Sequence, residues 1–408
     1  MPPYAGLSTG ASAACRSDRY TFGLGHLRRC RAIAHSLVEN FKGVSILIIT
    51  GSQIAGAFNF SARVDFVKIP SVIKLYNGEY TSIDKHIDLT DTLQMRQSII
   101  QHTAESFQPD IMIVDKEPLG LRGEMLPTLK YLREQGCRLV LGLRDVMDSA
   151  EKLKREWEQT DALAHVENLY DDIWVYGPED FWDPLTGLDV SDQVREKTLY
   201  LGFLRRSRPS SPVTMNLPSE PYLLVTGGGG GDGARLMTQV LGAYAAKAHD
   251  LPRALLVLGP LMPTGERTEI FRQGELMDNV DVIEFDNSME DLVEGASAIV
   301  GMCGYNTFCE VLSFNKPALI VPRTNPREEQ FIRARRAEQL NLVQMMLPSD
   351  ADDAVSLSAA LAGLPGRALP DSAGGAEMLN GLETINAFVS KWAASRPAAD
   401  LYAVADAG

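Results

Sequence analysis

Residues 298–322 constrain the fold of this chain most, because they read as strand, turn, helix and strand in immediate succession. A short apolar run ends at Gly301, apolar residues at helical spacing follow Gly304, and a second apolar run lies between Pro317 and Pro322. In a parallel sheet such a unit directs the helix N-terminus, with its free N–H groups and partial positive charge, to the carboxyl ends of the strands. We therefore predict an anion site, suited to a diphosphate, at this turn.

Glu310 admits two interpretations at this point. It stands one turn into the predicted helix, where its carboxylate can reach past a bound phosphate to the hydroxyls of a ribose, with Tyr305 and Asn306 as further ligand contacts. Alternatively, Thr307 and Glu310 have the Thr-x-x-Glu spacing of a capping box, in which each side chain satisfies a backbone donor at a helix start. This stretch alone leaves both interpretations open.

The rest of the chain repeats the alternation of strand and helix. At 408 residues the chain exceeds what one hydrophobic core usually organises, so two domains are expected. Strands separated by helices predict doubly wound, mostly parallel sheets of the α/β class. The apolar runs predicted as strands include 44–49, 64–69, 111–114, 138–143, 173–176, 199–201, 222–225, 255–258, 280–285 and 342–347. No clean strand is predicted within residues 1–20.

The predicted domain boundary lies at residues 205–218, a polar stretch with three prolines and no apolar period. Residues 1–204 then form the first domain and residues 219–375 the second. An apolar stripe at helical spacing predicts a last helix at residues 376–394. Residues 395–408 are rich in alanine and are predicted as a frayed tail.

Composition excludes several classes of function. The formal net charge is −14, which argues against nucleic acid as the partner because a phosphate backbone needs a basic face. Local basic clusters remain at Arg205, Arg206, Arg208, Arg333, Arg335 and Arg336. Five cysteines without a Cys-x-x-Cys pair indicate a reduced, cytoplasmic protein without disulfides or structural zinc. No apolar run is long enough to span a bilayer, and no secretory signal is expected.

A glycine-rich loop at residues 227–233 follows one predicted strand and precedes a helix. Glycines at such a place let backbone amides approach an anion closely, which makes Gly227, Gly228 and Gly229 candidate phosphate contacts. The loop lacks the Lys-Ser or Lys-Thr of a Walker A motif and the acidic residue of a dinucleotide fingerprint. The alternative is a flexible turn without a ligand.

Three candidate catalytic residues lie in the first half. Gly25 and His26 stand at a glycine turn before a helix, where an imidazole can act as a general base or hold a phosphate oxygen. Asp115 and Asp145 each lie at or just after the carboxyl end of a predicted strand, which borders the crevice of a doubly wound sheet. Either carboxylate can instead cap a helix, and an isolated histidine is more often structural. The other histidines lack metal-ligand spacing, so no metal or other cofactor is expected.

Several of these motifs combine into one pattern, completed by Glu329 and Gln330 in a later helix. The pattern resembles the two-domain GT-B glycosyltransferases, and among them the family 28 enzymes typified by the N-acetylglucosaminyltransferase of peptidoglycan synthesis. The resemblance is best over residues 222–343. It rests on the glycine-rich loop 227–233, on Gly301-x-x-Gly304 with Glu310, Pro317 and Pro322, and on Glu329-Gln330.

The resemblance implies two Rossmann-like domains that face a cleft. The first domain would receive the acceptor and the second would bind the nucleotide sugar, with residues 376–394 crossing back to the first domain. One departure concerns the start of the chain. The family begins with an apolar strand directly before its first glycine loop, and residues 15–20 are a poor substitute for it.

The resemblance also implies roles for individual residues. Glu310 would bind the ribose hydroxyls, Glu329 and Gln330 would contact the donor sugar, and the loop with Gly25 and His26 would lie by the reacting centre. The family has two glutamines where this chain has Glu329-Gln330, which leaves the identity of the sugar open.

We therefore expect a metal-independent, inverting glycosyltransferase of the hexosyltransferase type that uses a UDP-sugar. The acceptor stays open; a lipid-linked or cell-envelope glycan is one option, with peripheral contact at the inner face of the membrane. Residues 25–30 also look like the start of the nucleotide-sugar hydrolases of nonulosonic acid biosynthesis, which transfer the sugar to water. A nucleotide-sugar-binding protein without catalysis is the non-enzymatic alternative. The products distinguish the three: a glycosylated acceptor, free sugar, or neither.

Overall fold

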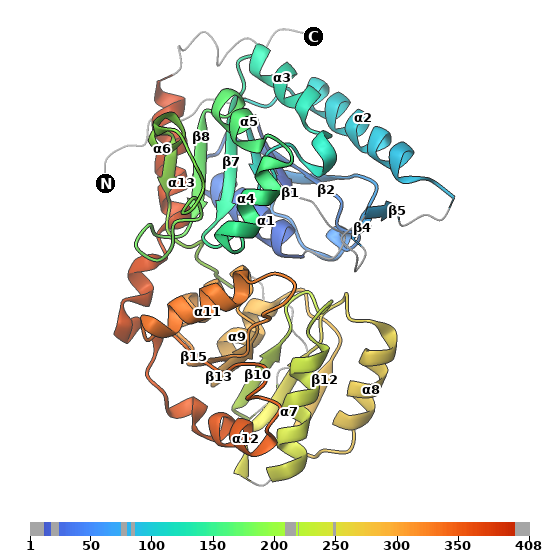
Figure 1. Cartoon of the computed structure of the whole chain (residues 1–408), viewed down its shortest axis with the longest axis vertical. Coiled ribbons are helices and arrows are strands. Elements are labelled where there is room, and N and C mark those ends of the chain that lie inside the picture. Colours follow the sequence, from blue (N-terminus) through green and yellow to red (C-terminus); the bar gives the residue numbers. More distant parts are fainter. Residues whose placement is uncertain are drawn as a thin grey trace. The chain divides into compact units, whose positions relative to one another are not determined.

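The chain divides into two compact units, shown in Figure 1. The computed structural model describes residues 12–17, 24–74, 80–82, 86–208, 218, 220–247 and 250–395, with only the backbone described for residues 12–17 and 74. Unit 1 comprises Met1–Asp145, Ala150–Leu204 and Asn380–Gly408, and unit 2 comprises Val146–Ser149 and Arg205–Leu379. Most of the predicted linker, residues 209–217, lies outside the described residues, as does the predicted tail beyond residue 395.

Unit 1 is built on a seven-stranded sheet in the order β3-β2-β1-β6-β7-β8-β9, and every pairing in it is parallel. Strands β6 and β8 are buried at every residue, as expected where helices cover both faces of a parallel sheet. The strands are β1 Ser12–Ser17, β2 Ser45–Thr50, β3 Val64–Lys68, β6 Ile111–Asp115, β7 Arg138–Arg144, β8 Asp172–Tyr176 and β9 Thr198–Tyr200, and a separate antiparallel pair joins β4 Val72–Lys74 to β5 Tyr80–Ser82.

Strand β1 corrects the prediction that residues 1–20 hold no clean strand. Ser12 to Ser17 pair with Ser45 to Thr50 of β2 along the full length of both strands, and β6 pairs on the other side. The sequence Ser-Ala-Ala-Cys-Arg-Ser has no β-branched residue, so its intrinsic strand preference is weak. Pairing with a neighbour on each side decides the conformation instead, and this is the strand that the family resemblance required before the first helix.

The helices of unit 1 lie on both faces of the sheet. One group is formed by α1 and α13, which pack together, and another by α2, α3 and α5, in which α3 contacts both of the others. This arrangement confirms the predicted doubly wound α/β sheet. The helices are α1 Leu24–Asn40, α2 Leu89–Phe107, α3 Leu126–Glu134, α4 Ala150–Glu158, α5 Ala162–Leu169, α6 Asp192–Glu196 and α13 Gly381–Ala394.

Helix α13 is counted with unit 1 although it follows unit 2 in the chain. It begins at Gly381, later than predicted, because Gly375–Met378 form a 3-10 turn. The Phe388 ring meets Trp174 edge to face, with 5.3 Å between ring centroids, and Asn386 Nδ2 donates to Ser36 Oγ of α1 at 2.9 Å. These contacts attach α13 to α1 and to the sheet of unit 1.

Unit 2 contains a second parallel sheet, in the order β12-β11-β10-β13-β14-β15. Its strands are β10 Tyr222–Thr226, β11 Arg253–Val257, β12 Val280–Ile283, β13 Ala298–Gly301, β14 Ala318–Ile320 and β15 Gln344–Met345. Side chains of β10, β11 and β13 form one core with α7 and α12, which includes Leu223, Leu256, Met237, Val300 and Leu357. The prediction of strand, turn, helix and strand across residues 298–322 is confirmed by β13, α10 and β14.

The helices of unit 2 also form two groups. Helix α7 packs against α8 and α12, whereas α9 packs against α10. The helices are α7 Ala234–Lys247, α8 Thr264–Gly274, α9 Met289–Gly295, α10 Tyr305–Ser313, α11 Glu329–Gln339 and α12 Ala354–Gly363. Short 3-10 turns occur at Ala55–Ala57, Leu121–Gly123, Leu364–Gly366, Pro370–Ala373 and Gly375–Met378.

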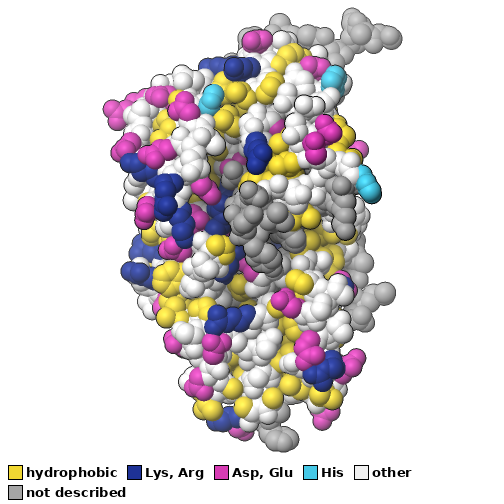
Figure 2. Space-filling model, turned by 45° about the vertical axis from the view of Figure 1, so that its right-hand side comes forward, with side chains coloured by type: hydrophobic (Ala, Val, Ile, Leu, Met, Phe, Trp, Pro, Cys, Tyr) yellow, Lys and Arg dark blue, Asp and Glu magenta, His cyan; other side chains and the backbone are white. Residues whose placement is uncertain are grey.

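Surface features agree with the composition of the chain. On the face in Figure 2, basic and acidic side chains of the described residues are interspersed. Within the described residues, no helix combines the length and apolarity needed to cross a membrane. No disulfide joins Cys30, Cys137, Cys303 and Cys309, all of which are buried.

Candidate active site

Unit 1 brings three predicted residues to one edge of its sheet. His26 is the third residue of α1, which follows β1; Asp115 is the last residue of β6; and Asp145 directly follows β7. Because β1, β6 and β7 are neighbouring parallel strands, their carboxyl ends meet at the same edge. Gly25, in the first turn of α1, precedes His26, whereas Gly23 of the predicted turn lies outside the described residues.

His26 and Asp115 contact each other directly. His26 Nδ1 lies 2.5 Å from Asp115 Oδ2, and Arg29 Nη2 donates to the same oxygen at 2.7 Å while its Nε donates to Oδ1 at 3.3 Å. Arg29 stands one turn after His26 on α1, so both side chains project from the same face of the helix. The Asp115 side chain is fully buried, whereas His26 keeps 12% of its side chain exposed. Asp115 is thus committed to His26 and Arg29, and the helix-cap interpretation of Asp115 is wrong.

The contact with Asp115 determines the tautomer of His26. A carboxylate only accepts hydrogen bonds, so we infer that His26 Nδ1 carries the proton and donates it to Asp115. Nε2 then holds the free lone pair, and among the described residues none hydrogen bonds to it. This arrangement is that of an imidazole oriented to accept a proton at Nε2.

The surroundings keep this imidazole neutral. Burial is the largest influence on His26, and with the charges of Arg29 and Lys116 it outweighs the attraction of Asp115, so the pKa of His26 falls from 6.5 to about 4. Burial raises the pKa of Asp115, but the Arg29 charge and the interaction with His26 lower that pKa well below its usual range. At neutral pH the cluster is therefore a carboxylate paired with a guanidinium, beside an imidazole that is free to take up a proton.

Asp145 is placed differently from Asp115. It is fully buried at the end of β7, and a Cβ atom added at Gly177 would lie 2.8 Å from the Asp145 Cβ atom, so the backbone after β8 packs closely against it. Of the two predicted carboxylates, Asp115 is the one that hydrogen bonds to His26.

In unit 2 the start of α10 tests the capping-box interpretation of Thr307 and Glu310. The helix begins at Tyr305 with Gly304 as its N-cap residue, and no side chain caps it. Thr307 therefore lies inside the first turn, and the capping-box interpretation is wrong, because the glycine turn starts the helix three residues before Thr307. Glu310 is 1% exposed in the second turn. Its role in ribose binding stays a prediction.

Two arginines hold this turn, and the sequence analysis placed both in basic clusters. Arg333 is fully buried; its Nη1 donates to the Cys303 carbonyl at 2.9 Å, and its guanidinium lies 5.8 Å from the centre of the Tyr305 ring. Arg206 Nη2 donates to Asn306 Oδ1 at 2.6 Å. The predicted ligand contacts Tyr305 and Asn306 are consequently engaged by side chains of the protein itself.

The glycine-rich loop after β10 is compact. Gly227 and Gly233 approach so closely that a Cβ atom on Gly227 would lie 2.9 Å from the Gly233 Cα atom. Gly230 has a φ of 90°, and its added Cβ would meet the Leu258 carbonyl at 2.5 Å. Gly228 also has a positive φ, 66°, but a Cβ there would meet nothing within 4 Å. Close packing thus explains the glycines at 227, 230 and 233, whereas Gly228 borders open space. The Gly229 carbonyl accepts a hydrogen bond from the Leu261 backbone N–H at 3.0 Å.

Arg323 links the remaining predicted residues, and the sequence analysis missed it. Its guanidinium forms ion pairs with Asp232 of the glycine-rich loop and with Glu329, the first residue of α11. Its backbone N–H donates to Gln330 Oε1 at 3.0 Å. The two residues predicted to contact the donor sugar therefore share Arg323 as a partner.

A short segment that the sequence analysis assigned to the first domain also contacts the start of α11. Val146–Ser149 belong to unit 2, although the strand before them and the helix after them belong to unit 1. Asp148 Oδ1 accepts from the Glu328 backbone N–H at 2.9 Å, and the Asp148 side chain is 3% exposed. A fully buried hydrogen bond runs from Arg333 Nη2 to the Val146 carbonyl at 3.3 Å.

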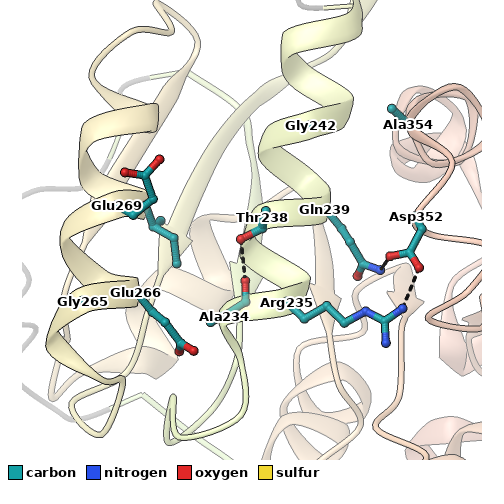
Figure 3. A pocket seen from close by; sticks show the side chains of 11 residues that line it. Ala234, Arg235, Thr238, Gln239, Gly242, Gly265, Glu266, Glu269, Asp352 and Ala354 are labelled. Carbon is teal, nitrogen blue, oxygen red and sulfur yellow. Dashed lines mark hydrogen bonds and ion pairs between the residues drawn. The ribbon is translucent and has the colours of Figure 1, made fainter.

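A hollow of about 700 Å³ lies elsewhere in unit 2, between α7, α8 and the start of α12 (Figure 3). Asp352 accepts from Arg235 Nη2 at 2.6 Å and from Gln239 Nε2 at 2.7 Å on one side of it, and Glu266 and Glu269 lie on α8. None of the predicted site residues lines it. Its lining comes from the flanks of helices, whereas the predicted ligand contacts lie at strand ends and helix starts.

Comparison with known proteins places these features in context. Residues 222–364 match the family model described as the glycosyltransferase family 28 C-terminal domain. Proteins of Methanosarcina acetivorans and Methanosarcina mazei, each described as an uncharacterized glycosyltransferase, are 23% and 24% identical to this chain, covering 76% of it and 79% of each relative.

Solved structures show the same architecture. The chain is similar to the glycosyltransferase of kitacinnamycin (17% identity, TM-score 0.60, 95% of this chain and 98% of that chain). It is also similar to a UDP-glucosyltransferase from Polygonum tinctorium (15%, 0.63, 95% and 100%) and to MurG of Acinetobacter baumannii (13%, 0.56, 94% and 100%). The two parallel α/β sheets and these likenesses confirm the predicted GT-B fold.

Proposed function

We propose a donor and a mechanism for this chain on the premise that it is a glycosyltransferase of the GT-B fold with a family 28 C-terminal domain at residues 222–364. Such an enzyme transfers a sugar from a nucleotide sugar to an acceptor. In our proposal the donor is a UDP-sugar, the transfer inverts the anomeric carbon, and no metal ion takes part. A UDP-glucosyltransferase and a complex with UDP-2fluoro-glucose among the similar structures support the choice of UDP.

The hydrogen bond between His26 and Asp115 carries the proposal. It holds the imidazole in the tautomer whose Nε2 accepts a proton, and burial keeps that imidazole unprotonated at neutral pH. When Nε2 takes up a proton, the ionised Asp115 compensates the new positive charge directly. Arg29 keeps Asp115 ionised, and its positive charge adds to the effect of burial in lowering the pKa of the imidazole.

The chemical step is a single displacement. His26 Nε2 removes the proton of an acceptor hydroxyl while the acceptor oxygen forms a bond to the anomeric carbon. The bond from that carbon to the diphosphate oxygen breaks, and the diphosphate leaves with the electron pair. Attack from the face opposite the leaving group inverts the configuration at the anomeric carbon.

Unit 2 would hold the donor. The N-terminus of α10 has no side-chain cap, and its positive dipole end suits the diphosphate and the charge that develops as it leaves. Gly228 of the glycine-rich loop borders open space, so its backbone is accessible to a ligand. Glu310 would accept from the ribose hydroxyls, and Glu329 and Gln330 would contact the sugar. The acceptor in this proposal is a hydroxyl-bearing molecule, with a lipid-linked or envelope glycan as the first class to screen.

Product analysis tests the proposal. The full chain is incubated with UDP-sugars and a panel of hydroxyl acceptors, and the products are separated and their anomeric configuration is read by NMR. A glycosylated acceptor of inverted configuration with release of UDP is expected. Free sugar without acceptor glycosylation would instead establish a nucleotide-sugar hydrolase. Nucleotide binding without turnover of any UDP-sugar would establish a binding protein, and retention of configuration would contradict the single displacement.

A further inference from the structure

Arg323 lies at the carboxyl edge of the sheet in unit 2, just after β14. Its guanidinium reaches Asp232 in the loop that follows β10, and β13 stands between β10 and β14 in the sheet. Neighbouring strands are about 4.8 Å apart, so this ion pair crosses the carboxyl end of β13. The chain that leaves β13 there is the turn into α10. Arg323 therefore stands beside the helix start at which the diphosphate is proposed to bind.

The guanidinium of Arg323 is shared between two partners. Two carboxylates, Asp232 and Glu329, form ion pairs with it where an anion is proposed to bind. Arg323 Nε is buried and has no hydrogen-bond partner among the described residues, although the side chain as a whole is 22% exposed. A guanidinium has five donors in a planar fork that fits phosphate oxygens. The fork has donor capacity left for such a ligand.

The two carboxylates differ in how readily they can be released. The Asp232 side chain is 40% exposed, whereas the Glu329 side chain is 8% exposed. Water can solvate Asp232 as soon as it leaves the guanidinium, but a released Glu329 would remain a largely buried charge. Asp232 is therefore the partner that an incoming anion displaces.

We propose that Arg323 binds the diphosphate of the donor and gives up Asp232 in exchange. The inference rests on the proposed function, because it places the diphosphate at the start of α10. Without donor, Asp232 occupies the guanidinium; with donor, diphosphate oxygens take its place. Arg323 keeps its ion pair with Glu329, which holds that carboxylate beside the sugar. Removal of the donor or of the nucleotide product restores the ion pair with Asp232.

A purely structural role of Arg323 makes a different prediction. If Arg323 only fastens the glycine-rich loop to α11, then loss of either partner loosens the loop, and Arg323→Gln and Asp232→Asn both weaken nucleotide binding. If Asp232 competes with the diphosphate, the two substitutions act in opposite directions. The sign of the Asp232→Asn effect therefore distinguishes the two roles.

The test is calorimetric titration of the full chain and its variants with UDP, preceded by titration of the unaltered chain with UDP, GDP and dTDP. We expect Arg323→Gln to weaken UDP binding about ten- to a hundredfold, as expected for lost charge-assisted hydrogen bonds. We expect Asp232→Asn to strengthen it about three- to tenfold by removing a competing charge. The double variant should bind like Arg323→Gln, because Asp232 acts through Arg323.

Arg253 and Asp281 provide matched controls in the same unit. They form a bidentate ion pair at 2.7 and 2.9 Å with comparable exposure, at the amino ends of β11 and β12, opposite the proposed site. Arg253→Gln and Asp281→Asn should leave UDP affinity unchanged. If Arg323→Gln does not fold, Arg323→Lys keeps the charge without the fork and should still weaken binding several-fold.

Two results would overturn the exchange. Either Arg323→Gln binds UDP like the unaltered chain, or Asp232→Asn weakens binding as Arg323→Gln does. Both leave the proposed function intact, since the unaltered chain binds UDP in each. If the unaltered chain binds none of the three nucleotides, the proposed function itself is wrong and the role of Arg323 is wrong with it.

Discussion

The clusters at the carboxyl edges of the two sheets use the same kinds of side chain in opposite ratios. In unit 1 one carboxylate, Asp115, serves both Arg29 and His26. In unit 2 one guanidinium, Arg323, serves both Asp232 and Glu329. The first cluster is almost closed to solvent, whereas the second is partly open.

The difference matches two kinds of task. A buried cluster holds one atom, His26 Nε2, in one orientation and one protonation state, as a general base requires. A cluster with one partly exposed carboxylate has a partner that it can release, as a site that receives an anion requires. The comparison predicts that substitutions in unit 1 change turnover and that substitutions in unit 2 change nucleotide affinity.

The largest expected effect tests the first half of this comparison. His26→Asn should lower turnover by about 10²- to 10⁴-fold, the effect of a lost general base, and leave UDP affinity nearly unchanged. His35→Asn is the matched control, because His35 stands on the same helix and accepts from the Ser61 backbone N–H at 3.2 Å. Steady-state rates with an identified acceptor provide the measurement. Near-normal turnover of His26→Asn would remove the imidazole from the chemistry.

A smaller effect tests the second half. Glu310→Gln should weaken UDP binding by roughly ten- to a hundredfold, because a charged acceptor of ribose hydrogen bonds is lost. It should also lose the preference of the unaltered chain for UDP over 2′-deoxy-UDP. The helix start is unaffected, since Gly304 rather than Thr307 stands at the N-cap. Equal discrimination between the two nucleotides in both proteins would exclude contact with the 2′-hydroxyl.

The pH dependence of the free energy of unfolding below pH 6.5 tests the lowered pKa of His26 in unit 1. The folded-state pKa of His26 is about 4 against an unfolded value of 6.5, so the unfolded chain binds more protons in this window and stability falls as the pH drops from 6.5 to about 4. His26→Asn should reduce this fall in the free energy of unfolding by up to about 1.4 kcal/mol per pH unit. His35, whose pKa is also lowered to about 4, remains in that variant as an internal reference.

Tryptophan fluorescence during urea unfolding measures this effect in unit 1 alone. All four tryptophans of the chain, Trp157, Trp174, Trp182 and Trp392, belong to unit 1. Identical pH profiles for the unaltered chain and for His26→Asn would show that folding does not lower the pKa of His26.

The smallest expected effect distinguishes packing from ligand contact among the glycines of unit 2. Gly304→Ala places a Cβ atom where nothing lies within 4 Å, but alanine is a poorer N-cap residue than glycine, so stability should fall by only about 0.5–1 kcal/mol, whereas UDP affinity should fall a few-fold. Gly230→Ala meets the Leu258 carbonyl at 2.5 Å and should instead destabilise unit 2 by about 1–3 kcal/mol. Thermal unfolding with and without UDP measures both. Unchanged affinity of Gly304→Ala would move the diphosphate away from this turn.

Local pattern explains what could be predicted from the sequence. Apolar runs that end in glycine or aspartate indicate the carboxyl ends of buried strands, and on this basis Asp115 and Gly304 were predicted at the edges where they lie. His26 was predicted from the glycine turn before its helix, without the strand that precedes it. The same reasoning could have found Arg323, which follows Pro322 just after a predicted strand. It was missed because the local sequence around an arginine does not indicate which residues it pairs with. Its partner Asp232 lies 91 positions away in the chain.

Long-range partners explain what could not be predicted. Strand β1 has the composition of a loop and becomes a strand because β2 and β6 flank it. Arg333 stands near Arg335 and Arg336 in the sequence, which is typical of an exposed basic cluster. It is nevertheless buried, and the carbonyls of Cys303 and Val146 accept its hydrogen bonds. Neither partner is visible within the local sequence of the residue that depends on it.

The attachment of α13 to α1 has a consequence for synthesis of the chain. Ser36 and Asn386 hydrogen bond across 350 positions, whereas nearly all of unit 2 is one continuous segment, Arg205–Leu379. On the ribosome the segment for unit 2 therefore emerges in full before α13 exists. During that interval the surface of α1 that α13 covers has no partner, and it is available to chaperones or to other nascent chains. Unit 1 begins first and is completed last.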